Sequence, residues 1–262
     1  MAQRFVAVED EARWKSRWRL VELVEARDLW LALLGRRKVL TRAVHQHGMP
    51  RATDRLVLLG MHWGPSVLAL ALFRDAGLDP RFVYRKVPGE IARVAPFHYL
   101  YLKLLVAYIR RMCAGRDISV PGARKVLHNA LGERGTPVVL LDAPITSTGH
   151  SVWGRVLDQK TEFYRDGPEL LVEGQARCVL YTLGLAPDGT NVLTCSEPFQ
   201  PGSAEQLLQR YAEWMTQCLT TDSAQWRLWH AAQQLFRGRL TVDAEADAAQ
   251  PVTVVDSRAA PP

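Results

Sequence analysis

The sequence predicts an α/β protein with a central sheet, mostly parallel or mixed, flanked by helices. Short apolar runs of strand length alternate along the chain with longer segments of helical periodicity, which is typical of this class. Two of these runs, at 56–61 and 136–141, are almost wholly apolar and therefore suit strands that are buried on both faces. The chain has 262 residues, of which 48% are hydrophobic, and can bury one sizeable core.

The first 50 residues (1–50) are predicted to form a helical segment that packs on the rest of the domain. Trp14, Trp18 and Val24 recur at near-helical spacing, and a second apolar run at 29–34 is followed by Gly-Arg-Arg-Lys. An apolar helix end followed by three cations is also typical of helices that lie in a membrane interface. Peripheral membrane contact through these helices is therefore an alternative interpretation.

The most hydrophobic stretch of the chain, residues 56–73, carries no charge but is interrupted by Gly64 and Pro65. A Gly-Pro pair breaks regular structure, and proline suits the first turn of a helix. The stretch is therefore predicted to be a strand at 56–61, a turn and a helix, rather than a membrane span. His62 then lies where the strand ends, at the edge where open α/β sheets place their ligand-facing groups.

The remaining elements follow the same alternation of strands and helices. Strands are predicted at 81–85, 136–141, 178–183 and 192–195, with an antiparallel edge at 178–196, and helices at 95–112, 120–134, 170–175, 203–220 and 224–237. These elements form one α/β domain, 51–237. Residues 238–262 are rich in Ala, Asp, Pro and Val without periodicity, and are predicted to be a poorly ordered tail.

Positive charge is concentrated in residues 81–134, which hold eleven Lys or Arg against three acidic residues. Such a segment favours an anionic partner: a phosphate, an acidic carrier protein or an anionic membrane face. A solvated basic face is the plainer interpretation. The sequence contains no recognisable nucleic-acid-binding module, so no nucleic-acid partner is expected.

The four cysteines, at 113, 178, 195 and 218, lie too far apart for a zinc knuckle or a redox CxxC pair. They are predicted to be reduced and mostly buried, which favours the cytoplasm, and no metal site is expected. Residues 1–20 carry charge throughout and do not have the pattern of a secretion signal.

Two side chains at strand ends are candidates for acid–base chemistry. His62 can project over the sheet edge and take a proton from a bound nucleophile. Asp142 follows the buried run at 136–141, so it emerges at the same edge if the two strands are parallel, where a carboxylate can fix the tautomer of an imidazole. The plainer interpretations are a core histidine bonded to a carbonyl, and an aspartate that caps a turn.

The order of these motifs resembles that of a known family. A histidine in the context GMHWG (60–64), the sequence VYR (83–85) and a buried strand closing in LLDAP (140–144) are followed by SVWGR (151–155) and a closing aromatic segment. The series is similar to the bacterial lipid A late acyltransferases, members of the lysophospholipid acyltransferase-like superfamily. The resemblance covers roughly residues 55–237.

The resemblance implies an acyltransferase-like fold and an enzyme that moves an acyl group from an acyl carrier protein or acyl-coenzyme A thioester to a hydroxyl or amine. His62 would be the general base, and cations or backbone N–H groups near the helix that starts at Pro65 would stabilise the oxyanion. The thioester is a substrate, and no cofactor is implied. The product would belong to lipid or secondary-metabolite biosynthesis, made in the cytoplasm or at the inner face of the membrane. Substrate-binding residues implied by the resemblance are Trp63, Arg85, Arg110, Arg111 and Arg116.

The chain departs from the family pattern at two places. The family has an acid five positions after the histidine, where this chain has Val67. Either another carboxylate orients His62, with Asp142 the best placed, or an unassisted histidine acts as a weaker base. A third alternative is a non-catalytic relative that binds an acyl chain or a carrier protein. Family members also begin with a membrane-spanning helix, and the apolar run at 29–34 is too short to span, which predicts a soluble or peripheral protein. The carboxylates considered after Asp142 are Asp158, Glu162 and Glu173.

Overall fold

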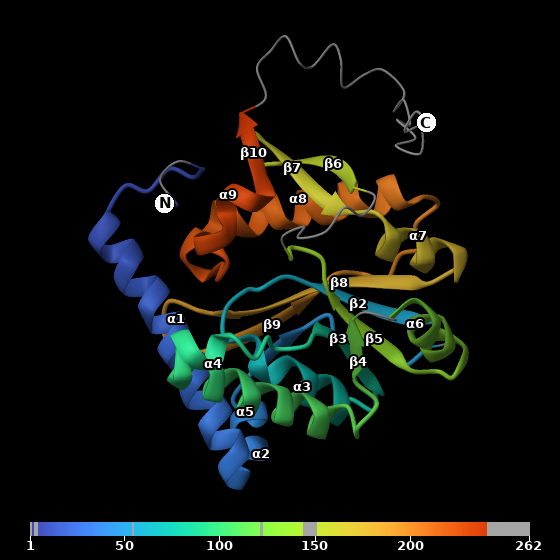
Figure 1. The fold of residues 1–262 in the computed structure, drawn as a ribbon, viewed down its shortest axis with the longest axis horizontal. Coiled ribbons are helices and arrows are strands. Elements are labelled where there is room, and N and C mark those ends of the chain that lie inside the picture. The colour runs from blue at the N-terminus through green and yellow to red at the C-terminus, as the bar shows by residue number, and fades with distance from the viewer. Residues whose placement is uncertain (1, 3–4, 54, 121–122, 144–150, 240–262) are drawn as a thin grey trace.

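A central sheet of seven strands forms the frame of the molecule (Figure 1). The structure, a computed structural model, describes residues 2, 5–53, 55–120, 123–143 and 151–239. Across the sheet the strands follow the order β1-β9-β8-β2-β5-β3-β4. Their bounds are β1 His45–His47, β2 Leu56–Gly60, β3 Pro80–Arg85, β4 Ile118–Val120, β5 Thr136–Leu140, β8 Arg177–Leu185 and β9 Asn191–Cys195.

The sheet is mixed, with a parallel centre. Strands β8, β2, β5, β3 and β4 are parallel to one another, whereas β9 is antiparallel to β8 and carries β1 on its outer side. This topology confirms the predicted fold class and the antiparallel edge at 178–196. Periodicity does not predict β1 or β4, because three residues are too few to show an alternation.

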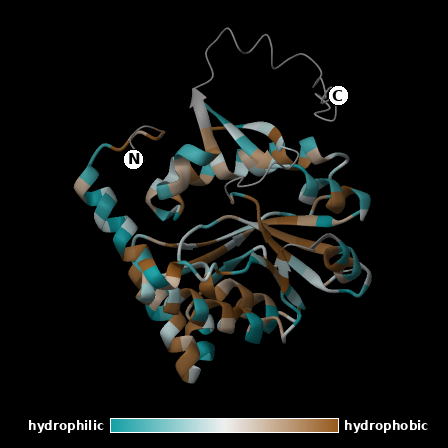
Figure 2. Ribbon diagram, viewed as in Figure 1, coloured by the Kyte–Doolittle hydropathy of each residue, from teal (hydrophilic) through white to brown (hydrophobic). Residues whose placement is uncertain are grey.

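The central strands are apolar because both of their faces are covered. In β2, Val57 and Leu59 belong to the core on one face and Leu56 and Leu58 to the core on the other, and none is more than 1% exposed. Each such side chain contributes about 1.5–3 kcal/mol to folding through its burial. Figure 2 shows the same distribution, with hydrophobic residues gathered in the central strands and in the helices below them in that view.

Helices cover both faces of the sheet. On one face lie α3 (Ala69–Asp75) and α5 (Pro96–Met112), together with the end of α1 (Glu11–Leu31). On the other face lie α6 (Ala123–Gly132), α7 (Asp166–Glu173) and α8 (Ala204–Asp222).

The uncharged stretch after β2 has the predicted organisation of strand, turn and helix. The chain turns at 61–65, forms a 3-10 turn, η3 (Ser66–Leu68), and continues into α3. Within the described residues, no helix is both long enough and apolar enough to cross a membrane.

A second sheet, of three antiparallel strands, is not predicted from the sequence. Its order is β10-β7-β6, with β6 at Ser151–Val156, β7 at Gln159–Tyr164 and β10 at Phe236–Arg239. In β7 the alternate residues Gln159, Thr161 and Phe163 are buried. Two of these three residues are polar, so the alternation of buried and exposed positions does not produce an alternation of apolar and polar residues in the sequence.

The predicted helix at 224–237 is wrong. This segment contains two 3-10 turns, η4 (Ser223–Gln225) and η5 (Trp229–Ala231), then a single helical turn, α9 (Ala232–Leu235), and β10. Trp226 is extended, with φ −76° and ψ 126°, because its backbone pairs with that of Trp63. Tertiary contacts therefore override the helical periodicity here.

The N-terminal helices pack against the C-terminal part of the domain. The Trp14 indole N–H donates to Ser223 Oγ at 2.9 Å, and Arg17 Nε donates to Asp222 Oδ2 at 3.0 Å. After α1 the chain kinks at Gly35, within η2 (Ala32–Arg36), and continues into α2 (Arg37–Arg42). A further short helix, α4 (Ile91–Val94), precedes α5. The predicted tail begins inside β10, and its residues 240–262 lie outside the described part of the chain.

Candidate functional site

The register of the two central strands brings His62 and Asp142 together. β2 and β5 are parallel neighbours in which Gly60 pairs with Leu140, and each candidate side chain lies two residues beyond that pair. His62 Nδ1 and Asp142 Oδ1 are 2.8 Å apart. The juxtaposition predicted from the two strand ends is therefore confirmed.

Asp142 is buried, with 0% of its surface exposed, and receives three hydrogen bonds. The His62 ring nitrogen donates to Oδ1, while Oδ2 accepts both the His62 backbone N–H and the Trp226 indole N–H, each at 2.8 Å. The backbone amide and the indole can only donate, so both require lone pairs on Oδ2. These contacts fix the carboxylate in position and orientation.

This arrangement determines the tautomer of His62. Because Nδ1 donates its proton to Asp142, the neutral ring presents Nε2 with a free lone pair, as a general base requires. The His62 side chain is 33% exposed, so the ring is reached from outside the protein. Burial alone would lower the pKa of His62, but the charge and hydrogen bond of Asp142 outweigh it and raise the pKa above its ordinary value of 6.5.

The turn that carries His62 is held by the segment 225–227. The Gly64 backbone N–H donates to the Gln225 carbonyl and the Arg227 N–H donates to the His62 carbonyl, both at 2.8 Å. Gly64 has φ +55°, and a Cβ at this position would lie 2.2 Å from the Leu183 carbonyl oxygen. Only glycine fits this turn, both for its backbone conformation and for the space available.

The structure shows which of the candidate carboxylates lies beside His62. Val67 is 5% exposed and belongs to the apolar core between the sheet and α3 and α5. Of the four carboxylates considered from the sequence, Asp142 is the one bonded to His62. The others lie elsewhere in the fold: Asp158 in the β6–β7 turn, Glu162 in β7 and Glu173 at the end of α7.

The backbone amides next to His62 are already hydrogen-bonded within the protein. The amides of Trp63, Gly64 and Ser66 donate to backbone carbonyls at 2.7–2.9 Å, and that of His62 donates to Asp142. Pro65 has no N–H. These amides are therefore engaged, and the role of cations or of amides further along η3 in stabilising an oxyanion stays a prediction.

Trp63 and Arg85 lie on the same edge of the sheet as His62. Trp63 is only 5% exposed, and its indole packs close to Gly184 of β8, so its contact with a substrate stays a prediction. Arg85 is the last residue of β3, which neighbours β5. Of the predicted cations, Arg85 lies on the strand nearest to the His62–Asp142 pair.

The other three predicted arginines lie at the opposite edge. Arg110 and Arg111 are in the last turn of α5, and Arg116 precedes β4. Arg116 is 2.6 Å from Asp79, which precedes β3. The structure therefore does not bring these three residues to His62, and their role in donor binding stays a prediction.

Cys113, which has basic neighbours in the sequence, is a poor nucleophile in this structure. It is buried, and burial raises the pKa of its thiol to about 11. Among the residues that the structure describes, no three His, Cys, Asp or Glu side chains lie close enough together to hold a metal ion.

Sequence reasoning misses the role of Trp226. The residue is recognised as part of an aromatic segment, but its indole N–H is the third donor to Asp142 and its ring is fully buried. Its position 84 residues beyond Asp142 leaves no signal in local spacing. The one indication that the sequence offers is the resemblance of the closing aromatic segment, which includes Trp226, to the end of the family pattern.

Comparisons with known proteins do not extend this description. No family model matches the chain, and no curated protein matches it significantly. The site is accordingly interpreted from its own geometry.

Proposed function

We propose that this protein is an acyltransferase that uses a thioester donor, with His62 as its general base. The observation that carries the proposal is the His62–Asp142 pair, which lies at the carboxyl edge of a parallel sheet with its imidazole partly exposed. A buried carboxylate that fixes an exposed imidazole in this tautomer is the arrangement used for acid–base catalysis. Asp142 supplies the carboxylate that is missing at Val67. The missing acid was the reason to consider a non-catalytic relative.

The reaction requires one proton to be moved twice. His62 Nε2 takes the proton from the acceptor hydroxyl or amine as its oxygen or nitrogen attacks the thioester carbonyl. The tetrahedral intermediate then collapses with cleavage of the carbon–sulfur bond, and the imidazolium returns the proton to the leaving thiolate. Asp142 stabilises the imidazolium between the two steps. Arg85, at the same edge, is the proposed cation for the oxyanion or for an anionic group of the donor.

We also propose that the donor is an acyl carrier protein or acyl-coenzyme A and that the protein works at a membrane face. Basic side chains in 81–134 suit either donor, since both are acidic. Exposed apolar side chains on α1, η2, α4 and α5 support peripheral membrane contact. They are Leu23, Trp30, Leu34, Val94 and Phe97.

The test is thioester consumption and acyl transfer, followed by intact-mass spectrometry with a panel of acyl-carrier and acyl-coenzyme A donors. The expected result is turnover by the wild type that is lost in His62→Ala and kept in His128→Ala. His128 is an exposed histidine on α6 and serves as the matched control. Saturable donor binding with equal background turnover in all three proteins would instead identify a non-catalytic binding protein.

A further inference from the structure

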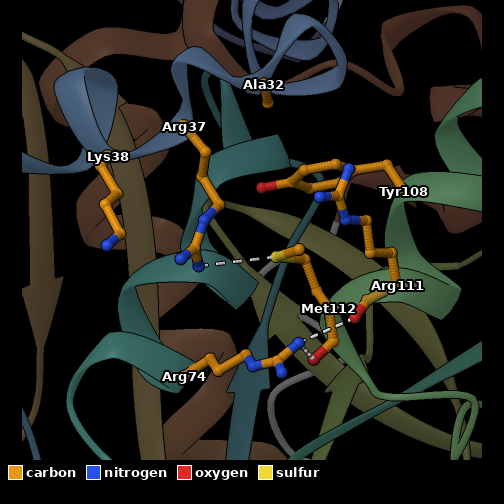
Figure 3. Close-up of a pocket in the computed structure, with 8 residues that line it drawn as sticks. Ala32, Arg37, Lys38, Arg74, Tyr108, Arg111 and Met112 are labelled. Atoms are coloured by element: carbon orange, nitrogen blue, oxygen red, sulfur yellow. Dashed lines mark hydrogen bonds between the residues drawn. The ribbon is translucent and has the colours of Figure 1, made fainter.

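A second candidate site lies at the opposite edge of the sheet from His62. A cavity of about 340 Å³ opens between η2, α2, α3 and α5 (Figure 3). α3 and α5 end beside it, before β3 and β4 begin, whereas His62 follows the end of β2. The cavity is therefore separate from the catalytic dyad proposed above.

Four cationic side chains line this cavity, and they are only partly neutralised. Arg37 pairs with Asp75 at 3.0 Å. Arg74 donates to the Arg111 carbonyl at 2.9 Å, a contact that caps α5 but brings no negative charge. Among the described residues, the side chains of Lys38 and Arg111 have no hydrogen bond or ion pair. The cavity therefore carries an excess of positive charge that suits an anion.

The inner wall of the cavity holds an unpartnered donor. Tyr108 is 1% exposed, and within the described part of the chain its hydroxyl has no hydrogen-bond partner. In Figure 3 this hydroxyl points into the space between Arg37 and Arg111. Buried hydroxyls in native proteins are nearly always hydrogen-bonded, so this one calls for an acceptor. An anion that enters between the two guanidinium groups would supply it.

The backbone beside the cavity has an unusual geometry that positions two of the cations. η2 is a kink between two helices, at which Gly35 has φ +82°, a conformation that other residues rarely adopt. Arg37 and Lys38 follow directly and lie at the cavity.

We propose that this cavity is a phosphate-binding site, in which Arg37, Arg111 and Tyr108 hold the phosphate oxygens and Lys38 adds positive charge. A phosphate group offers several acceptor oxygens, and a guanidinium fork matches their geometry. The volume also accommodates the organic part of a phosphorylated small molecule or a lipid head group. Leu34 and Val39, which are 73% and 64% exposed, flank Arg37 and Lys38 in the sequence. If the ligand is a lipid head group, these two side chains would contact the acyl region of the membrane.

The first test measures the melting temperature of the whole protein against inorganic phosphate, with sodium chloride added to keep the ionic strength constant. A specific site gives a saturable rise, because a ligand that binds only the folded state stabilises it. Arg111→Gln should weaken phosphate binding by about tenfold or more, since charge-assisted hydrogen bonds are strong. Lys103→Gln makes the same charge change on the exposed side of α5 and should leave binding unchanged.

Tyr108→Phe separates a ligand-binding role from a structural one. The ring is kept and only the unpartnered hydroxyl is removed, so the phosphate-free protein should be at least as stable as the wild type. Its affinity for phosphate should fall several-fold. A variant with unchanged affinity would show that the hydroxyl does not contact the ligand and would overturn its place in the site.

A second arm distinguishes the source of the phosphate. Vesicles of phosphatidylglycerol are compared with vesicles of phosphatidylcholine by co-sedimentation. Binding to the anionic vesicles that is lost in Arg111→Gln and competed by inorganic phosphate would identify a lipid head group. Phosphate binding without such vesicle binding would identify a soluble phosphate compound. If neither probe binds in a manner sensitive to Arg111→Gln, the proposal is overturned. None of these measurements depends on acyl transfer, so the result is independent of His62.

Discussion

Replacing Asp142 with asparagine tests whether His62 Nδ1 must face a carboxylate oxygen. Asparagine has the same shape but offers one acceptor oxygen and one donor NH2 group. Oδ2 of Asp142 accepts from two groups that can only donate, the His62 backbone N–H and the Trp226 indole N–H. The amide oxygen must therefore take that position, which turns the NH2 group toward His62 Nδ1. The imidazole proton then moves to Nε2, and the lone pair that acts as the base is lost.

The expected loss follows from this change of tautomer. The corresponding substitution in a Ser-His-Asp triad lowers kcat by about 10⁴, with the geometry preserved. A factor of this size corresponds to about 5 kcal/mol of transition-state stabilisation. Rates are read from thioester consumption by intact-mass spectrometry, with Asp158→Asn in the exposed β6–β7 turn as the matched control. If Asp142→Asn keeps more than about a tenth of the wild-type kcat, Asp142 does not orient a catalytic base.

Further predictions concern pH, the support of the dyad and the turn beneath it. Because the pKa of His62 is raised, the rate should increase with pH through a midpoint above 6.5; a midpoint below 6.5 would contradict the influence of Asp142. Because this pKa is raised in the folded state, the His62–Asp142 pair stabilises the protein fully below pH 6.5 and less as pH rises through the raised pKa. The difference in unfolding free energy between wild type and His62→Gln should therefore shrink at high pH. Trp226→Phe removes one hydrogen bond to the buried carboxylate and should cost about 1–3 kcal/mol in urea denaturation, with a lower kcat; a neutral result would mean that the indole does not hold Asp142. Gly64→Ala should destabilise the protein by more than about 1 kcal/mol, whereas Gly132→Ala, where a Cβ meets nothing within 4 Å, should not. Val67→Asp places an acid five positions after His62 but buries a carboxylate in an apolar core, so it should lower the melting temperature without raising kcat. A gain in kcat would show that the acid is needed there.

The parts of the fold that could be predicted are those whose local pattern agrees with their tertiary setting. Strands β2 and β5 are apolar because both faces are buried, and the Gly-Pro break after β2 marks a real turn. The parallel relation of these two strands then placed His62 and Asp142 at one edge. This prediction requires only that the two strands are parallel neighbours whose ends lie side by side, so no side-chain contact has to be known in advance.

The parts that could not be predicted depend on contacts between distant segments. The segment 224–237 is predicted to be a helix, but pairing between Trp63 and Trp226 holds the chain extended at Trp226. β7 alternates in burial but not in hydropathy, because Gln159 and Thr161 face the interior. The placement of the basic residues is of the same kind: Arg85 and Arg116 belong to one charged segment, yet they lie at opposite edges of the sheet.

The most direct test of the dyad is a ¹⁵N spectrum of the histidine side chains, recorded across the titration of His62 and assigned with His62→Gln. The dyad predicts a neutral ring that is protonated at Nδ1 and unprotonated at Nε2, with a pKa above 6.5 that falls in Asp142→Asn. A neutral His62 that carries its proton on Nε2, or a pKa that Asp142→Asn leaves unchanged, would contradict the assignment of His62 as a base oriented by Asp142.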